Sequence, residues 1–384
     1  MRNLLISFIL LFSLPAMAQI QTLKGRVIDS ATQAGIAYTN IGVEGTFYGT
    51  ASDAQGFFEL KIPDEYKNEQ LFFSAVGYQN QMLNISDLLK QDFHKIALVE
   101  QTYNIEDVDI AAQSRVLFRI LKTAAKNIPA NFHQGPLGVK FYYEEVSHPN
   151  NDSTGQRREA VVELYDETGY GSPSITDAFN KRNYQFSEVK KNFESYSIPS
   201  AKTGFDELLE MDIARLSNGI LNEELLNNFD LKLENISPFN GDSVWIISYK
   251  TIKADLAHTG DYYATQLDGK IYISQNNYEI LRNECVVESS RNHPHNRSLA
   301  TERQDQSQVS YHYTAVYQQQ NGKYFLSYLD CDKTYVDASN QQTTYSRKAS
   351  ALGFTTSPAI ISGKDYFEDE AFVESFWNSF ERPE

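Results

Sequence analysis

The sequence predicts a mainly β protein: an N-terminal β-sandwich of the seven-stranded type, then a larger α+β domain with a curved antiparallel sheet and a few helices. Three observations carry this prediction. Short alternating segments between Lys24 and Tyr78 are separated by Gly, Asp and Pro, as in a small sandwich. Strand-like segments dominate from Pro136 onward. Only a few stretches repeat apolar residues at helical spacing.

Residues 1–18 have the composition of a secretory signal peptide. Arg2 precedes an apolar run from Leu4 to Leu14, and the small-residue triplet Ala16-Met17-Ala18 follows. The run is shorter than the roughly 20 apolar residues that a membrane-spanning helix needs. We therefore expect cleavage after Ala18, no transmembrane helix, and export to the periplasm, the outer membrane or the cell surface.

The charge balance of the chain argues against two kinds of partner. The 384 residues carry a formal net charge of −16, and removal of the expected signal, with its single basic residue, would make it −17. An acidic chain of this kind argues against binding to nucleic acid and against electrostatic docking to anionic lipid. It leaves open an unknown envelope protein, a lipid or a glycan as the partner.

The two cysteines, Cys285 and Cys331, are expected to remain unbridged. Asn321-Gly322 predicts a two-residue hairpin turn, and counting outward from it places Cys331 opposite His312. In a simple meander Cys285 would then lie two strands from Cys331, about 9–10 Å away at ordinary strand spacing. That separation exceeds the reach of a disulfide.

The expected sandwich, residues 19–110, divides into short strands with one apolar face each. The apolar positions are Leu23, Gly25 and Val27; Ala37, Thr39, Ile41 and Val43; and Phe58, Leu60 and Ile62. Leu71–Val76 is almost wholly apolar, as in a central strand. Asp53-Ala54-Gln55-Gly56 predicts a turn. The same Asp and Gly weakly suggest a calcium loop, but too few oxygen ligands follow.

Five separated pieces of this stretch resemble the carboxypeptidase-regulatory-like domain: Lys24–Asp29, Ala37–Ile41, Gly45-Thr46 with Gly49-Thr50, Asp53 with Gly56–Phe58, and Val76–Tyr78. The resemblance implies a transthyretin-like sandwich. Such domains follow zinc carboxypeptidase catalytic domains and precede the plug of many TonB-dependent receptors. The matching residues correspond to turns and core positions, so the resemblance implies an accessory module and no site.

The next part, residues 111–135, is expected to be a helical junction. Ile105–Ile110 would be the last strand of the sandwich, Arg115–Asn127 a helix, and Ile128-Pro129 its end. The string Ile120–Phe132 looks like the junction in exported proteins that pair this sandwich with a β-rich domain of unknown function.

Residues 136–384 are expected to form that β-rich domain. Gly171–Arg182 is expected to be a polar loop, Asp206–Asn218 an amphipathic helix, Leu221–Asn228 a second short helix, and Tyr366–Phe380 a closing helix. Asp268-Gly269 and Asn276-Asn277 predict turns. The segments Val244–Tyr249 and Gly269–Leu281 resemble the curved sheet of periplasmic lipoprotein carriers, whose members hold an acyl chain between sheet and helices. This is a resemblance of fold only, and helices packing the concave face solid is an equal alternative.

No catalytic, cofactor-binding or metal-binding residue is predicted. None of the seven histidines begins the His-x-x-Glu pair of a zinc carboxypeptidase, and neither a Gly-x-Ser-x-Gly elbow nor a phosphate-binding loop occurs. His293-Pro294-His295, beside Arg291 and Arg297, suggests a metal or anion site. The segment Ser289–Gln308 is rich in Asn, Arg, Ser and Gln, so an exposed loop is the favoured interpretation.

The 24 tyrosines allow two interpretations, since pairs such as Tyr142-Tyr143 and Tyr262-Tyr263 would stack on sugar rings or simply suit half-exposed sheet faces. The sequence favours a non-enzymatic exported envelope protein with a binding or scaffolding role. One alternative is a carrier or binder of a hydrophobic or glycan ligand in the curved sheet. Another is a hydrolase whose residues converge from distant strands.

Overall fold

The computed structural model describes residues 21–37, 39–44, 49–53, 55–75, 78–100, 110–149, 152–194, 204–239, 242–291, 306–337, 339–364 and 374–383. The chain divides into two compact units, Met1–Gln101 and, in the main, Thr102–Ser237 with Gly241–Pro383. The expected signal peptide, the His293-Pro294-His295 segment and the first part of the expected closing helix lie outside the described residues.

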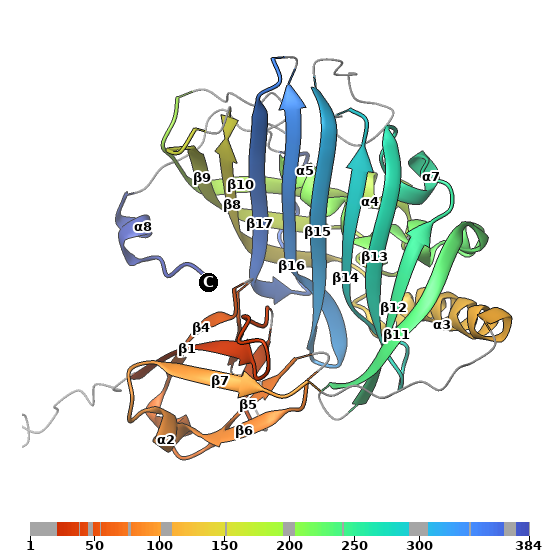
Figure 1. The fold of residues 1–384 in the computed structure, drawn as a ribbon. Coiled ribbons are helices and arrows are strands. Elements are labelled where there is room, and N and C mark those ends of the chain that lie inside the picture. Colours follow the sequence, from red (N-terminus) through yellow and green to blue (C-terminus); the bar gives the residue numbers. More distant parts are fainter. Residues whose placement is uncertain are drawn as a thin grey trace, which may run out of the picture. The chain divides into compact units, whose positions relative to one another are not determined.

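The first unit is a sandwich of two sheets, as the sequence predicts (Figure 1). One sheet has the order β4-β1-β7, with β4 (Phe57–Ile62), β1 (Gln21–Asp29) and β7 (His94–Leu98). The other has the order β3-β2-β5-β6, with β3 (Gly49–Ala51), β2 (Asn40–Val43), β5 (Gln70–Ser74) and β6 (Gln81–Asn84). Two short helical turns, η1 (Asp64–Tyr66) and α2 (Ile85–Leu88), join strands.

The core of this unit follows from strand alternation. Successive side chains of a strand point to opposite faces, so one residue in two enters the space between the sheets. The buried set is apolar: Leu23, Val27, Ile36, Ile41, Val43, Phe58, Leu60, Ile62, Leu71, Phe73, Ala75, Ile85, Leu88, Ile96 and Leu98. The predicted turn is present, with Gly56 at φ +88°. Asp53 Oδ1 there accepts hydrogen bonds from the amides of Gln55 and Phe57, both at 2.8 Å.

The second unit is built on one antiparallel sheet of ten strands with the order β10-β9-β8-β17-β16-β15-β14-β13-β12-β11. The strands are β8 (Leu137–His148), β9 (Gln156–Asp166), β10 (Arg182–Lys191), β11 (Phe229–Phe239), β12 (Asp242–Thr251), β13 (Ala264–Ser274), β14 (Ile280–Ser289), β15 (Gln306–Gln320), β16 (Lys323–Asp337) and β17 (Gln342–Thr355). After β10, at one edge, the chain crosses to β11 at the other edge and then meanders back until β17 pairs with β8.

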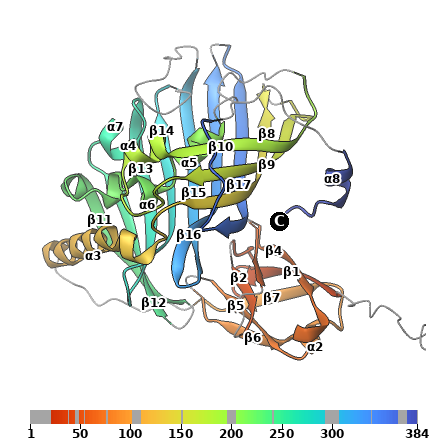
Figure 2. The same cartoon turned by 180° about the vertical axis from the view of Figure 1, so that it is seen from behind.

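The sheet curls around its inner face. Strands β8–β10 run across the direction of β15–β17, and helical segments lie against the face that they enclose (Figure 2). These segments are α3 (Ile110–Asn131), α4 (Ile175–Lys181), α5 (Gly204–Leu209), α6 (Ile213–Leu216), η4 (Gly219–Leu221), η5 (Leu226–Asn228) and α7 (Leu256–Thr259). One core cluster joins α3, α5, α6, η4 and η5 to the sheet. The predicted curved sheet with few helices is confirmed.

Helix α3 is longer than predicted at both ends. Ile110, the last residue of the expected strand Ile105–Ile110, is already helical, while residues 105–109 are not described. Pro129, the expected end, lies inside the helix. Phe132 N still donates to Ile128 O at 2.9 Å, and side chains of Gln134 and Lys323 donate to the carbonyls of Pro129 and Ala130. These donors satisfy carbonyl groups of the last turn, which follows the proline.

Three further predictions are wrong, and in the first two a polar residue that caps a helix is the cause. Gly171–Arg182, expected as a loop, contains α4, which Ser174 caps by accepting from Asp177 N at 3.0 Å. The expected helix Asp206–Asn218 is two helices, α5 and α6, because Asp212 caps the second. Leu221–Asn228 contains parts of two 3-10 turns, η4 and η5, rather than one helix.

Glycine is responsible for a fourth error. Asp268-Gly269, predicted as a turn, lies inside β13, where Gly269 pairs with Tyr249 on one side and Cys285 on the other. A Cβ at Gly269 would lie 2.4 Å from Cζ of Tyr249. The glycine is therefore needed because the tyrosine ring covers the strand, and it marks no chain reversal.

The predicted Asn321-Gly322 hairpin is present, with both residues at positive φ (52° and 75°). The predicted pairing across it is wrong by one residue, since Cys331 lies opposite Tyr313 and His312 opposite Asp332. A β-bulge shifts the register between Val316 and Tyr317. Both thiols are nevertheless free and buried, with Tyr313 on the strand between them, so the absence of a bridge was predicted correctly.

The last described element, α8 (Glu374–Ser379), covers the outer side of the sheet at β8 and β9. Trp377 and Phe380 contact the ring of Tyr142, with centroids 6.5 and 5.7 Å apart. The Arg382 side chain pairs with Glu159 on β9. Among all described helices, none combines the length and apolarity needed to cross a membrane.

Candidate functional site

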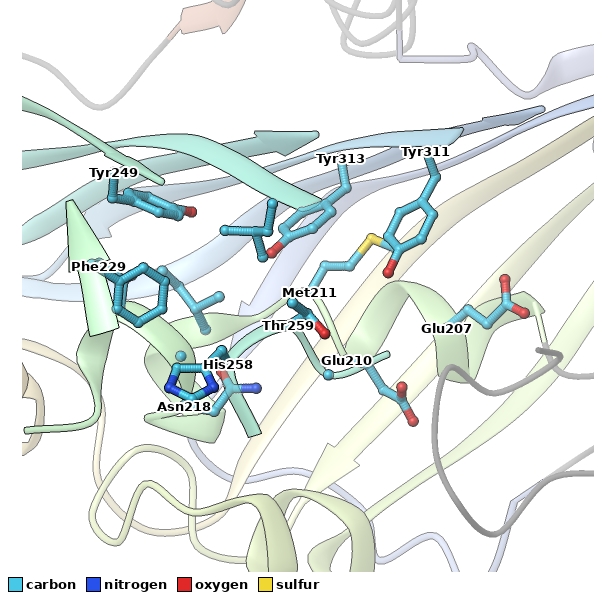
Figure 3. A pocket seen from close by; sticks show the side chains of 15 residues that line it. Glu207, Glu210, Met211, Asn218, Phe229, Tyr249, His258, Thr259, Tyr311 and Tyr313 are labelled. Carbon is cyan, nitrogen blue, oxygen red and sulfur yellow. The ribbon is translucent and has the colours of Figure 1, made fainter. Parts of the chain in front are cut away.

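The inner face of the ten-stranded sheet is the place where a carrier would hold its ligand, and the described apolar side chains on this face are buried in one core cluster. A cavity of about 40 Å³ remains between the sheet and the segments α5, α6, η4 and α7. Figure 3 shows Phe229, Tyr249 and His258 at one end of this cavity and Glu207 and Tyr311 at the other. This volume suits a few water molecules, whereas small-molecule pockets span about 300–1,000 Å³.

His258 is the notable polar group of this cavity. It is 5 % exposed, and its Nδ1 lies 2.5 Å from Oδ1 of Asp255, the residue that caps α7. Nε2 has no hydrogen-bond partner among the described residues. Partial burial opposes ionisation of Asp255, but Lys253 and His258 outweigh that effect and lower the pKa of its carboxyl to about 2. The carboxylate thus orients the imidazole and leaves Nε2 towards the cavity.

Most other polar side chains of the cavity are already engaged. Tyr249 Oη donates to Asn283 at 2.8 Å, and Tyr311 Oη donates to Asp261 at 3.3 Å. Burial, followed by the Asp261 carboxylate, raises the pKa of Tyr311 well above its ordinary value. Glu207 pairs with Arg347. The cavity therefore offers one unengaged imidazole nitrogen but no second activated group beside it.

One cross-strand row of residues crosses the inner face, and it ends in three buried charged side chains. Its members, one from each of the strands β12 to β9 across the sheet, are Tyr249, Gly269, Cys285, Tyr313, Cys331, Arg347, Glu145 and Arg158. Arg347 Nε lies 2.8 Å from Glu145 Oε2. Burial raises the pKa of Cys285 to about 12, so this thiol stays protonated and unreactive.

A second buried group, the Asp166 network, ties the helical layer to the edge of the sheet. Asp166 Oδ2 accepts from Arg182 Nε at 2.8 Å and from Arg215 Nε at 2.7 Å. Asp212 accepts from Arg182 Nη2 at 2.5 Å and from the hydroxyls of Tyr170 and Tyr317, each at 2.9 Å. Two carboxylates face two guanidiniums, so the network is balanced and suits a structural role.

The outer face of the same sheet is open and charged. A groove of about 540 Å³ runs across β11–β15, and its exposed side chains include Lys232, Lys250, Lys270, Asp268, Glu284 and His312. Lys250 Nζ lies 3.4 Å from Asp268 Oδ1. Glu284 accepts from Tyr272 Oη and Arg282 Nη2, both at 2.7 Å. The groove carries both signs of charge and so fits a polar partner better than an acyl chain.

The residues singled out in the sequence do not gather into a site. Asp53 completes a turn in the first unit, the cysteines lie on buried strands, and the His293-Pro294-His295 segment is not described. In the part of the chain that is described, no group of three or more His, Cys, Asp or Glu side chains is placed to hold a metal. His258 was missed, although the Asp255-x-x-His258 spacing of a capped turn was there to be noticed.

Residues 23–110 match the family model of the CarboxypepD_reg-like domain. The first unit is a carboxypeptidase-regulatory-like domain. This confirms the resemblance carried by the five sequence pieces. The model covers less than a third of the chain, and the buried positions of the regulatory-like domain form its core rather than a catalytic site. No curated protein matches the chain.

Solved structures with a similar arrangement match the larger part of the chain. One is a putative outer membrane lipoprotein-sorting protein domain from Vibrio parahaemolyticus (9% identity, 63% of this chain and 92% of that chain, TM-score 0.24). Others are a DUF1329 family protein from Desulfovibrio piger (7%, 63% and 92%, 0.24) and lipoprotein LppX from Mycobacterium tuberculosis (10%, 46% and 88%, 0.21).

Proposed function

We propose that the protein is an exported, non-enzymatic envelope protein that binds or scaffolds partners through the surfaces of its two units. The observation that carries this proposal is the contrast between the two faces of the ten-stranded sheet. The inner face leaves about 40 Å³, while the outer face has a charged groove of about 540 Å³. The signal-like residues 1–18 and the accessory character of the carboxypeptidase-regulatory-like domain support export and a non-catalytic role.

The division into a sandwich, residues 19–110, and a β-rich domain that follows it remains part of this proposal. Helix α3 contributes Leu117, Ile120, Leu121, Ala124 and Ile128 to the core of the second unit. We therefore expect a fragment that begins before α3 to fold, and one that begins after it, at residue 136, to unfold. Circular dichroism of both fragments tests this division.

The carrier alternative is tested by native mass spectrometry of protein purified from an envelope extract. A filled interior predicts the mass of the bare polypeptide. Copurification of a lipid or glycan of defined mass would contradict the proposal and favour the carrier.

The proposed binding face is tested by charge reversal in the groove. A photo-crosslinking residue in place of Ser248, which borders the groove, should give a discrete adduct in cells, and Lys250→Glu with Lys270→Glu should remove it. Lys190→Glu with Lys191→Glu, on the exposed end of β10, makes the same change of charge away from the groove and should leave the adduct in place. Equal loss in both variants would refute a specific site.

A second candidate, a hydrolase, is favoured by one observation, the Asp255–His258 pair with its unengaged Nε2 in the cavity. If this pair acts as a general base, ester or peptide hydrolysis by the chain would fall in both His258→Gln and Asp255→Asn. Hydrolysis that is absent, or that survives both substitutions, would rule out this candidate.

A further inference from the structure

The basic residues of the first unit are concentrated on one surface. Residues 21–100 contain six basic and ten acidic side chains. Four of the six basic ones lie on the outer face of the sheet β4-β1-β7, because they alternate with buried core positions along these strands: Lys24, Arg26, Lys61 and Lys95. An acidic unit therefore presents one face of opposite charge.

Two phenylalanines are exposed on the same face. Phe57 is 39 % and Phe93 is 48 % exposed, and their ring centroids are 6.4 Å apart. The strand register places Arg26 between Phe57 and Lys95, and the Arg26 guanidinium lies 4.9 Å from the Phe57 centroid. Exposed aromatic side chains next to cations are frequent at protein–protein contacts. We call Lys24, Arg26, Phe57, Phe93 and Lys95 the basic–aromatic face.

The basic–aromatic face encloses a shallow hollow of about 460 Å³. The hollow is bordered by both phenylalanines, by Phe58, by Lys24 with its partner Glu59 at 2.5 Å, and by Gly25. Asp53 also borders it, and its carboxylate is engaged by the amides of Gln55 and Phe57. Arg26 donates to the Gln55 carbonyl at 2.9 Å. Among the described residues, no carboxylate forms an ion pair with Arg26 or Lys95. The hollow thus offers an apolar seat with two cations at its side.

We propose that the basic–aromatic face binds an acidic polypeptide segment that packs an aromatic or large aliphatic side chain into the hollow, against the contacting rings of Phe57 and Phe93. The carboxylates of the segment would pair with Arg26 and Lys95, which complement its charge. This inference rests on the proposed binding role and names a partner chemistry for the first unit.

A peptide fits the face better than an anionic membrane does. The chain carries a net charge of −16, which repels an anionic bilayer that approaches over a wide area. A short segment interacts mainly with charges within a Debye length, about 8 Å at physiological salt. On this face the basic side chains Lys24, Arg26, Lys61 and Lys95 outnumber the acidic Asp53 and Glu59. The hollow also suits a single side chain of a peptide, which is how a folded domain recognises a short segment.

The test is a peptide array probed with the labelled full chain lacking residues 1–18. Its peptides combine acidic, neutral or basic residues with or without Phe and Trp. We expect binding to acidic peptides with an aromatic anchor at least about tenfold tighter than to acidic peptides without one, since each 1.4 kcal/mol of anchor burial gives a factor of ten. Binding should weaken several-fold between 50 and 500 mM NaCl because the charged contacts are screened.

Variants assign that binding to the face. Arg26→Glu with Lys95→Glu should lose the preference for acidic peptides, and Phe93→Ser should lose the preference for an aromatic anchor. Lys67→Glu with Lys90→Glu makes the same change of charge in the same unit, away from strands β4, β1 and β7, and should retain both preferences. Circular dichroism checks that each variant is folded.

Four results would overturn the inference: no preference for acidic aromatic peptides, no effect of the face variants, equal loss in the control variant, or tighter binding to vesicles with 30% anionic lipid than to any peptide. The groove variants Lys250→Glu and Lys270→Glu test the second unit separately. An intact groove adduct together with a negative array would refute this inference and leave the proposed function standing.

Discussion

The two units of the chain build their cores from different materials. The core of the first unit is a sandwich filling of aliphatic and aromatic side chains. The core of the second unit places charged residues among apolar ones, and Arg158, Arg215 and Arg347 are among its largest fully buried side chains. The smaller core is stabilised mainly by apolar burial, with a few hydrogen-bonded neutral side chains such as Thr39 and Ser52, whereas the larger one also depends on charges that are correctly paired.

This difference decides which unit is more sensitive to a single substitution. Removal of one partner from a buried ion pair leaves a charge that water cannot reach, and this costs more than the pair contributed. Loss of a methyl group in an apolar core leaves a small cavity with a graded cost. The loss of one buried charge should therefore lower the unfolding free energy of the whole second unit. The size of that loss should depend on pH.

The largest effect is expected from Asp166→Asn, which keeps the shape of the side chain and removes its charge. Arg182 would then keep Asp212, but Arg215 would lose its carboxylate partner, and we expect the second unit to lose about 3–5 kcal/mol of unfolding free energy. Urea denaturation followed by tryptophan fluorescence measures this loss, because both tryptophans, Trp245 and Trp377, lie in the second unit.

The pH dependence of that effect has a definite sign. Burial would raise the pKa of Asp166, but Arg182 and Arg215 outweigh it and hold the pKa below its ordinary value. The contribution of Asp166 is therefore fully present above its unfolded pKa of about 3.9 and is lost as the pH falls through the folded pKa. The difference between wild type and Asp166→Asn should shrink in acid. Exposed Asp230→Asn should change stability by less than about 0.5 kcal/mol, and an equal loss there would contradict the comparison.

A smaller effect is expected from Leu71→Ala in the first unit. Leu71 is fully buried between the sheets, and its truncation should cost about 2–4 kcal/mol through lost burial and a residual cavity. Because the surrounding core is apolar, the cost should be the same at pH 4 and pH 8. Hydrogen exchange of peptides from residues 21–100, read by mass spectrometry, measures the first unit by itself. A strong pH dependence there would remove the contrast between the cores.

The same contrast explains how much of the fold the sequence could predict. In the first unit, alternation at Leu23, Gly25 and Val27 corresponds directly to inward and outward positions, so the sandwich could be predicted strand by strand. In the second unit, the strands of the meander could be predicted for the same reason. The layer over the inner face could not, because the segment Asp206–Asn218 was expected to be one amphipathic helix, whereas it forms two short helices in which the charged Glu207 and Arg215 are buried as well.

The candidate sites were beyond prediction for a related reason. The Asp166 network combines residues that are far apart in the chain, such as Asp166 and Arg215. The Asp255-x-x-His258 spacing is visible in the sequence, but its burial beside a cavity depends on the packing of α7 against the sheet. Register errors have a local cause, since the bulge after Val316 adds one residue and moves every later pair by one place. A hairpin turn predicts the first pairs of a ladder but not where an extra residue enters it.

The smallest effect is expected at the surface of the second unit and compares like with like. A double-mutant cycle on Lys250 and Asp268, whose side chains are 56 % and 40 % exposed, should give a coupling of about 0.2–1 kcal/mol that fades as NaCl is raised. The same cycle on Arg182 and Asp166, which are 3 % and 0 % exposed, should give a coupling several times larger that salt hardly changes. Tryptophan fluorescence in urea follows both cycles. If the two coupling free energies were equal, burial would not strengthen the Arg182–Asp166 pair. The two cores would then differ only in their apolar residues.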